Sequence, residues 1–158
     1  MAEKVDVAVI GAGVIGCSVA YYLAREGIKV ALLERESIGS GSSAHATGFI
    51  SLLGTEFTPG PSFAFGLESY YEFPSLVEEL EDTTGMNLLY HRRPSLRLAL
   101  EQSEEELIKN LMSWQQEHVA MHWITAAEVH ELEPRLTPSL IGAVYEDESA
   151  QLDSYRLN

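Results

Sequence analysis

The feature that most constrains this chain is a glycine motif set between two apolar runs close to its first residue. Residues 5–34 read VDVAVIGAGVIGCSVAYYLAREGIKVALLE. The apolar, largely β-branched run over residues 5–10 is typical of a strand buried on both faces of a parallel sheet. Gly11, Gly13 and Gly16 follow at the G-x-G-x-x-G spacing of nucleotide-binding βαβ units. We therefore predict a strand, a helix and a second strand built around a phosphate site.

Each glycine of this motif has its own structural role. Gly11 turns the chain sharply, Gly13 lets the backbone lie against a pyrophosphate, and Gly16 lets the helix pack close to the preceding strand. The helix is expected over residues 14–26, with Gly27 ending it. Its free N–H groups and the positive end of its dipole would stabilise the phosphate without a Lys or Arg side chain.

An acidic residue ends the second predicted strand, which spans residues 30–33. Glu34 stands where a carboxylate accepts hydrogen bonds from both ribose hydroxyls and repels a 2′-phosphate. The motif therefore favours FAD or NAD over NADP, and the residues alone leave both open. The alternative is a glycine-rich turn that binds no ligand.

The predicted helix should bury one apolar face. We expect Val19, Tyr22 and Leu23 to lie on that face. Cys17 occupies a small-residue position that is expected to face the sheet, which favours core packing over redox chemistry.

A small, polar segment follows Glu34 directly. Residues 39–48 read GSGSSAHATG and lead into FISLL. A flexible linker is one interpretation of such a composition. We favour a backbone that lies close to a ligand, because the segment leaves the end of a nucleotide-site strand and enters an apolar run.

Helices and short strands alternate in the rest of the chain. We expect a helical pattern over residues 61–85, interrupted at Pro74, and strands over residues 88–90, 95–100 and 140–145. A further helix is expected from a Ser103–Glu106 capping box to about residue 117, and a shorter one from a Thr125–Glu128 box. Two buried parallel strands cannot form a doubly wound sheet, so we expect the sheet to be incomplete and completed from elsewhere.

Composition excludes several classes of partner and site. The formal net charge of −14 opposes binding to nucleic acid and to anionic membranes. No apolar run is long enough to span a membrane, and few residues precede the first strand, so no signal peptide is expected. One cysteine allows neither an internal disulfide nor a Cys-based zinc site. Metal-ligand spacing is also absent from the other histidines, His91, His118, His122 and His130. We expect a cytoplasmic protein.

These residues resemble a known family. The glycine fingerprint, GSGSSAHATG, YHRRPSLRLAL, ELEPRL and GAVYEDESAQLDSYRL are similar to the D-amino acid oxidase superfamily of FAD-dependent oxidoreductases, which includes glycine oxidase, sarcosine oxidase, and sarcosine and dimethylglycine dehydrogenases. Family members are more than twice as long, so the chain resembles their N-terminal portion.

The resemblance implies an α/β fold, with a Rossmann-like FAD-binding βαβ half and an incomplete sheet, followed by part of an α+β substrate domain. Residues 1–85 would begin the FAD-binding domain, residues 86–145 would begin the substrate domain, and residues 146–158 would return to the FAD-binding domain.

The cofactor implied by the resemblance is FAD, and most of the expected contacts lie in the first fifty residues. The pyrophosphate would be held by Gly11, Gly13, Val14, Ile15 and Gly16. The adenosine ribose would be held by Glu34 and Arg35. The pyrophosphate, ribityl chain and isoalloxazine ring would lie along Ser42, Ser43, Ala46, Thr47, Gly48 and Phe49.

His45 has two possible roles under this resemblance, covalent attachment to the flavin or a position near the ring. It aligns with the histidine of a Trp-His-Ala-Ala-Gly motif that is joined covalently to flavin in the sarcosine and dimethylglycine dehydrogenases. Here Ala44 replaces the tryptophan, and other branches of the family bind FAD noncovalently with His45 merely near the ring.

The implied reaction oxidises the C–N bond of a small amino acid or N-methyl amino acid by hydride transfer to the flavin. No catalytic residue or metal ligand is assigned, because the flavin does the chemistry. Arg92, Arg93 or Arg97 would be able to face a substrate carboxylate, although the family's carboxylate-binding arginine typically lies beyond residue 158. Two alternatives are a noncatalytic nucleotide-binding module completed by a separate chain and an NAD-dependent dehydrogenase fragment. The isolated chain is expected to be inactive.

Overall fold

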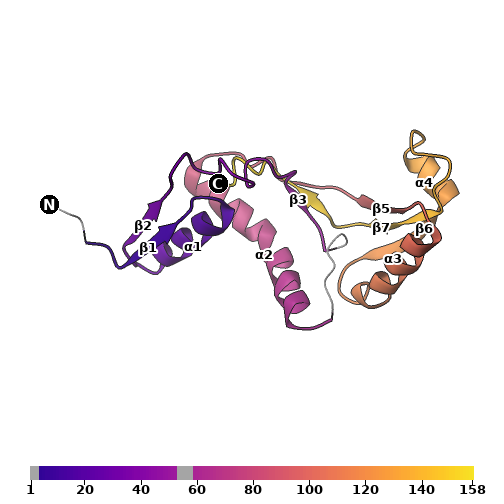
Figure 1. The fold of residues 1–158 in the computed structure, drawn as a ribbon, viewed down its shortest axis with the longest axis horizontal. Coiled ribbons are helices and arrows are strands. Elements are labelled where there is room, and N and C mark those ends of the chain that lie inside the picture. Colours follow the sequence, from indigo (N-terminus) through magenta and orange to yellow (C-terminus); the bar gives the residue numbers. More distant parts are fainter. Residues whose placement is uncertain (1–3, 53–58) are drawn as a thin grey trace.

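The computed structural model describes residues 4–52 and 59–158. The chain is elongated, with a small βαβ unit at one end, a sheet with two helices at the other, and one long helix between them (Figure 1). The two ends are joined by extended segments, which carry β4 (His91–Arg92), β5 (Ser95–Ala99), β7 (Gly142–Glu146) and β8 (Ala150–Gln151).

The expected βαβ unit is confirmed. Strand β1 (Val7–Ile10) leads into helix α1 (Val14–Arg25), and β2 (Val30–Leu33) pairs with β1 in parallel from Val7 opposite Val30 to Ile10 opposite Leu33. At Gly16 an added Cβ would lie only 1.8 Å from the carbonyl oxygen of Gly11, so this position admits only glycine. The helix thus packs as closely on its strand as the motif predicts.

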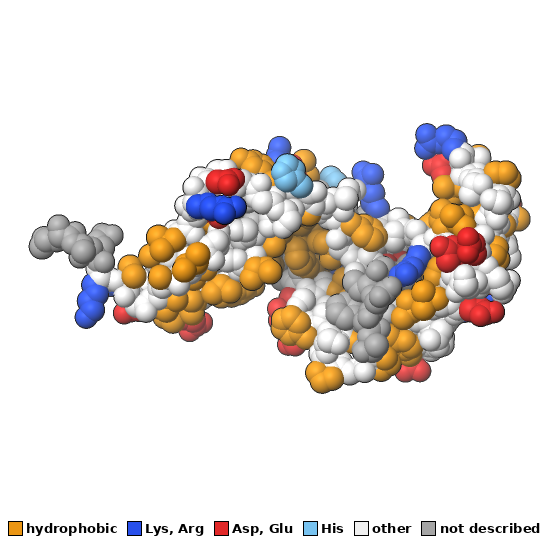
Figure 2. All heavy atoms as spheres, in the orientation of Figure 1, with side chains coloured by type: hydrophobic (Ala, Val, Ile, Leu, Met, Phe, Trp, Pro, Cys, Tyr) orange, Lys and Arg blue, Asp and Glu red, His pale blue; other side chains and the backbone are white. Residues whose placement is uncertain are grey.

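This sheet has only two strands among the described residues, and much of its apolar surface is open. Ile10 is 87% exposed and Leu33 is 53% exposed. Hydrophobic side chains accordingly gather on the end of the molecule that holds β1, β2 and α1 (Figure 2). The expected incomplete sheet is confirmed.

Helix α1 departs from the prediction because no residue in it is fully buried. Val19 is 45% and Tyr22 46% exposed, so their expected burial was wrong, and Leu23 is half-buried. Two strands about 4.8 Å apart cannot cover a helix about 10 Å wide. Cys17 is half-buried: it lines a groove of about 450 Å³ with Leu32 of β2 and Phe73 of the next helix, and this partial burial raises the pKa of its thiol.

Helix α2 (Pro61–Thr84) is the long central helix, and it runs through Pro74 without ending, so the expected interruption there was wrong. A proline removes one helical hydrogen bond, but the buried Tyr70 and Val77 on either side anchor both halves of the helix. Gly85 ends it in the left-handed conformation, with φ of 69°.

A small antiparallel sheet connects the first part of the chain to the last. Its order is β3 (Phe49–Ile50), β8 (Ala150–Gln151) and β4 (His91–Arg92). The strand expected over residues 88–90 was wrong because Leu89 adopts a φ of 55°, which interrupts an extended run. Pairing begins only at His91.

A second antiparallel sheet has the order β5 (Ser95–Ala99), β7 (Gly142–Glu146) and β6 (Met121–Thr125). Helices α3 (Gln102–Gln115) and α4 (Ala126–Leu132) pack beside it. The strands predicted over residues 95–100 and 140–145 are thus confirmed within one or two residues.

One of the two predicted capping boxes is present and the other is shifted by two residues. The box of Thr125 and Glu128 is confirmed at the start of α4. The box predicted from Ser103 and Glu106 was wrong, since Glu101 and Glu104 form it instead. In a run of closely spaced glutamates, the Glu104 carboxylate accepts the N–H groups of Leu100 and Glu101.

Three apolar clusters hold the molecule together. The largest joins α2, α3 and the second sheet through Leu52, Phe63, Tyr70, Ala99, Ile108, Val119, Met121 and Val144. A smaller one, built on Val77, Leu88 and Leu152, packs β3 and β8 against α2. These contacts fix β3, and therefore the end of the Gly/Ser segment, relative to the rest of the chain.

Candidate nucleotide-binding site

The turn between β1 and α1 is bordered by the end of β2 and by Ser43 of the Gly/Ser segment. Gly11 has a φ of 99° and donates its N–H to the Leu33 carbonyl at 2.8 Å. At Gly13 an added Cβ would lie 3.0 Å from the Ser43 hydroxyl oxygen. Nothing lies within 4 Å of a Cβ added at Gly11, so the turn is open there, whereas at Gly13 it faces Ser43.

The start of α1 is capped from a distance. Gly13 is the N-cap and has no side chain to accept a helical N–H. The Ser43 hydroxyl supplies the acceptor and takes the Val14 N–H at 3.0 Å across 29 residues. The Ser43 hydrogen is left to donate, which suits a phosphate oxygen at a helix N-terminus.

The Gly/Ser segment is structured. Gly39 donates its N–H to the Ala12 carbonyl at 2.8 Å, and Ala44 donates to Gly39 at 2.9 Å. These bonds hold the segment over the glycine turn, so the interpretation as a flexible linker was wrong.

Glu34 lies at the carboxyl end of β2 and points to the same turn. One carboxylate oxygen accepts the Ala12 N–H at 2.9 Å, and the other accepts Arg35 and Glu36 at 2.8 and 3.0 Å. These hydrogen bonds, the one from Ala12 most strongly, lower the pKa of the Glu34 carboxyl below its ordinary value. Glu34 is therefore ionised at neutral pH, and a carboxylate has about four acceptor sites, which leaves room for a ribose hydroxyl.

A cavity of about 370 Å³ joins these features. Six of the predicted cofactor residues line it: Gly11, Gly13, Glu34, Arg35, Ser42 and Ser43. Ile10 and Leu33, which the sequence reasoning did not assign to the site, add apolar walls. Their position at the carboxyl ends of the two strands was a signal that pointed to them.

A second cavity of about 210 Å³ continues from Ser43 along the rest of the segment. Six predicted residues line it: Val14, Ser43, Ala46, Thr47, Gly48 and Phe49. Since Ser43 borders both cavities, the predicted residues form one run from the end of β2 to β3.

Gly48 anchors this run to β8. It has a φ of 70°, and an added Cβ would lie 1.9 Å from the Leu152 carbonyl oxygen. The Gly48 carbonyl accepts the Leu152 N–H at 3.0 Å. Only glycine allows this approach, because any side chain would collide with the backbone of Leu152, the residue that follows β8.

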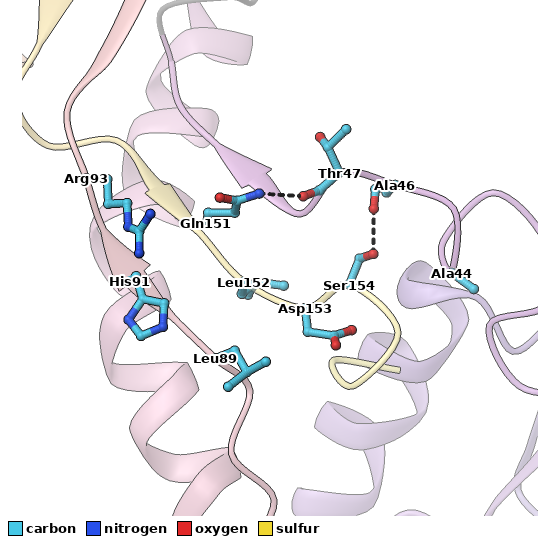
Figure 3. A pocket seen from close by; sticks show the side chains of 10 residues that line it. All are labelled: Ala44, Ala46, Thr47, Leu89, His91, Arg93, Gln151, Leu152, Asp153 and Ser154. Atoms are coloured by element: carbon cyan, nitrogen blue, oxygen red, sulfur yellow. Dashed lines mark hydrogen bonds between the residues drawn. The ribbon is translucent and has the colours of Figure 1, made fainter. Parts of the chain in front are cut away.

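Figure 3 shows a third cavity, of about 410 Å³, beside residues 44–47. Its wall is closed by Gln151, which donates to the Thr47 carbonyl at 3.3 Å, and by Ser154, which donates to Ala46 at 2.7 Å. His91 and Arg93 also line it from β4 and the residue that follows. Of the three candidate arginines, only Arg93 borders one of these three cavities. Sequence reasoning did not assign residues 151–154 to a site, although they lie within a quoted family segment.

Three predicted cofactor residues, Ile15, Gly16 and His45, lie outside these cavities. Ile15 is 79% exposed, and His45 is also exposed. Gly16 serves the packing of α1 on β1. Within the part of the chain that the structure describes, no group of three or more His, Cys, Asp or Glu side chains is placed to hold a metal ion, and no helix has the length and apolarity to cross a bilayer.

The described residues fit an adenine dinucleotide. The turn offers backbone N–H groups at a helix start, and the acidic side chain stands at the next strand end. The cavity between them shares Ser43 with the second cavity. The fold and site define a dinucleotide-binding α/β protein with an incomplete Rossmann-like sheet.

The chain belongs to the FAD dependent oxidoreductase family DAO, whose family model matches residues 6–158. This confirms the resemblance, the fold class and FAD as the cofactor of the family. The choice that the residues alone left open, between FAD and NAD, is thereby made.

Individual proteins agree with the family assignment. Glycine oxidase of Geobacillus kaustophilus (strain HTA426) is 33% identical over 147 residues, which cover 92% of this chain and 39% of that protein. Mitochondrial dimethylglycine dehydrogenase of Rattus norvegicus is 32% identical over 158 residues, covering 98% of this chain and 18% of that protein. The crystal structure of glycine oxidase from Bacillus cereus ATCC 14579 matches with a TM-score of 0.85 and 38% identity, covering 98% of this chain and 41% of the other. The chain therefore spans less than half the length of these relatives.

Proposed function

We propose that this chain forms the first half of an FAD site, with the ADP portion of the cofactor in the cavity between the glycine turn and Glu34. The observation that carries the proposal is that two side chains from later segments bind the same glycine turn. Glu34 accepts the Ala12 N–H, and Ser43 accepts the Val14 N–H. An ionised carboxylate there favours a free ribose and disfavours a 2′-phosphate.

Different residues would hold different parts of the cofactor. The backbone of Gly11, Gly13, Val14, Ile15 and Gly16 would hold the pyrophosphate, and Glu34 with Arg35 would hold the adenosine ribose. Ser42, Ser43, Ala46, Thr47, Gly48 and Phe49 would follow the rest of the cofactor toward the ring. The second cavity, which shares Ser43 with the first, supports this order.

When bound, FAD would accept the hydride from a carbon next to nitrogen. The chain's own residues would bind and orient it: the Ser43 hydroxyl would donate to a phosphate, and Glu34 would accept from the ribose. Gly48 holds its segment against Leu152, next to β8. No side chain of this span needs to move a proton in that role.

We further propose that the protein to which this span belongs oxidises the C–N bond of a small amino acid or N-methyl amino acid. Similarity to glycine oxidase and to dimethylglycine dehydrogenase supports this substrate class. Arg93 and His91 border a cavity beside residues 44–47, which leaves Arg93 as the candidate to face an anionic group. The 158-residue chain alone is expected not to turn over these substrates.

The expected division into residues 1–85, 86–145 and 146–158 remains part of this proposal. So does a cytoplasmic location, which the single cysteine supports. The open apolar face around Ile10 and Leu33 favours further polypeptide over the sheet. A separate subunit that completes a noncatalytic nucleotide-binding module is the second candidate for this face.

Flavin content tests the proposal. Purified chain incubated with FAD and freed of excess cofactor should show flavin absorbance, and a colourless protein that binds NAD instead would overturn it. We expect noncovalent binding, because Ala44 replaces the tryptophan of the covalent motif. Flavin that stays on the protein after denaturation would show attachment at His45 instead.

A further inference from the structure

A carboxylate is buried between the end of β7, helix α2 and the residue that follows β3. Glu146, the last residue of β7, is 0% exposed. No ion pair to it is found among residues 4–52 and 59–158. An unpaired buried carboxylate is unfavourable unless hydrogen bonds replace its lost water.

Hydroxyl groups supply those hydrogen bonds. The Ser51 hydroxyl donates to one carboxylate oxygen at 2.5 Å, and the Tyr70 hydroxyl reaches the other at 3.5 Å. The Ser95 side chain also hydrogen-bonds to Glu146. The three donors come from different segments: the residue after β3, the middle of α2 and the first residue of β5.

The charges around this group are mostly negative. Glu148 faces Glu146 from the turn after β7, and Arg92 of β4 interacts with Tyr70 and Glu148. Burial raises the pKa of the Glu146 carboxyl, and Ser51, Tyr70 and Ser95 oppose that rise. Burial and the nearby carboxylates raise the pKa of Tyr70 as well, so its hydroxyl stays a donor.

The position of Ser51 connects this cluster to the candidate cofactor site. Ser51 follows β3 directly, and β3 follows the segment that lines the second cavity. Ile50 also packs against the core clusters on both sides of this strand. Fixing Ser51 therefore fixes the end of the segment that begins at the glycine turn.

We propose that Glu146 is a positioning residue for the FAD site, which acts by holding Ser51 and through it residues 46–50. This inference rests on the proposed function. Removing one member of a buried hydrogen-bonded group leaves its partners unsatisfied, so loss of the Glu146 carboxylate should loosen the segments that it joins.

Three variants test the inference. Glu146→Leu removes the acceptor for Ser51 and Tyr70. Glu146→Gln keeps one acceptor oxygen for Ser51, and its side-chain N–H₂ group can donate a hydrogen bond to the Tyr70 oxygen. Gln115→Leu is the matched control: Gln115 is also 0% exposed, its side-chain oxygen and nitrogen have no partner among the described residues, and it lies in α3, away from β3.

Two measurements are made on each variant: the dissociation constant for FAD, and hydrogen exchange of the amides of residues 46–51. Glu146→Leu should weaken FAD binding about tenfold and speed exchange in this segment. Glu146→Gln and Gln115→Leu should stay within about threefold of the unmodified chain. The visible circular dichroism of bound flavin should change in Glu146→Leu alone.

The outcomes separate the two proposals. If the unmodified chain binds no FAD, the proposed function fails, and the exchange data still decide whether Glu146 fixes residues 46–50. If the chain binds FAD and Glu146→Leu leaves both affinity and exchange unchanged, the inference is overturned. If Glu146→Leu does not fold, Ser51→Ala takes its place, and it must reproduce the same loss of affinity for the inference to stand.

Discussion

The Ser43 hydroxyl accepts the Val14 N–H at 3.0 Å and so caps helix α1 from 29 residues away. Gly13, the N-cap itself, is free of any side chain at the point where a phosphate would approach. A serine from the following segment therefore does the capping, and the glycine turn keeps its open surface.

Replacing this serine should affect both the fold and the cofactor. Ser43→Ala should lower the free energy of unfolding by about 1 kcal/mol, the usual loss for a helix cap. It should also weaken FAD binding about fivefold, because one phosphate donor is lost. Chemical denaturation and FAD titration measure the two effects. Ser37→Ala, at an exposed position in the same segment, is the control. Equal affinities for Ser43→Ala and the control would contradict the assignment.

Gly48 should tolerate no side chain. Gly48→Ala places a Cβ 1.9 Å from the Leu152 carbonyl oxygen at a φ of 70°, and we expect a loss of about 1–3 kcal/mol of stability or more. Gly41→Ala is the matched control, since its Cβ would meet nothing within 4 Å. Thermal unfolding of the two variants should therefore differ clearly. Similar melting temperatures would show that residue 48 does not lie against β8.

Glu34 should contribute to the pH dependence of stability. Hydrogen bonds, first the one from Ala12, hold the pKa of its carboxyl below the ordinary value of 4.5. A lowered folded-state pKa gives stability that is present above about pH 4.5 and is lost as pH falls through the folded value. Glu34→Gln should reduce the drop in melting temperature between about pH 6 and about pH 3. An unchanged drop would mean that these bonds do not persist in solution.

Cys17 should react slowly for a half-exposed thiol. Burial raises the pKa of this thiol above 9.0, so little thiolate exists at neutral pH. Iodoacetamide should modify Cys17 more slowly than it modifies glutathione at about pH 8, with the rate rising at higher pH. The chain has one cysteine, so mass spectrometry reads the reaction directly. A faster reaction than with glutathione would contradict the burial of Cys17 beside α2.

Local sequence patterns predicted the parts of the fold that depend on near neighbours. The glycine spacing fixed the close packing of Gly16 on Gly11, and the Thr125 box marked the start of α4. The exposure of Val19 and Tyr22 was missed because burial depends on how many strands lie beneath the helix. Pro74 was misjudged because the packing of its neighbours outweighs one lost hydrogen bond.

The site was predictable where family motifs carried it. Glu34 and the Gly/Ser segment were assigned, and the structure brings both to one turn. The Ser51–Glu146 pair spans 95 residues, and neither residue stands in a motif that points to the other. Residues 151–154 border the third cavity only because β8 pairs with β3 and β4, a topology that the short strands do not reveal.

A competition experiment tests whether the ADP half of FAD occupies the cavity between the glycine turn and Glu34. FAD bound to the chain is titrated with ADP, with 2′-phosphorylated ADP-ribose and with FMN. The account predicts that ADP displaces FAD, that the 2′-phosphate analogue competes at least about tenfold more weakly because it meets the Glu34 carboxylate, and that FMN competes poorly. Equal displacement by the 2′-phosphate analogue, or displacement by FMN but not by ADP, would contradict it.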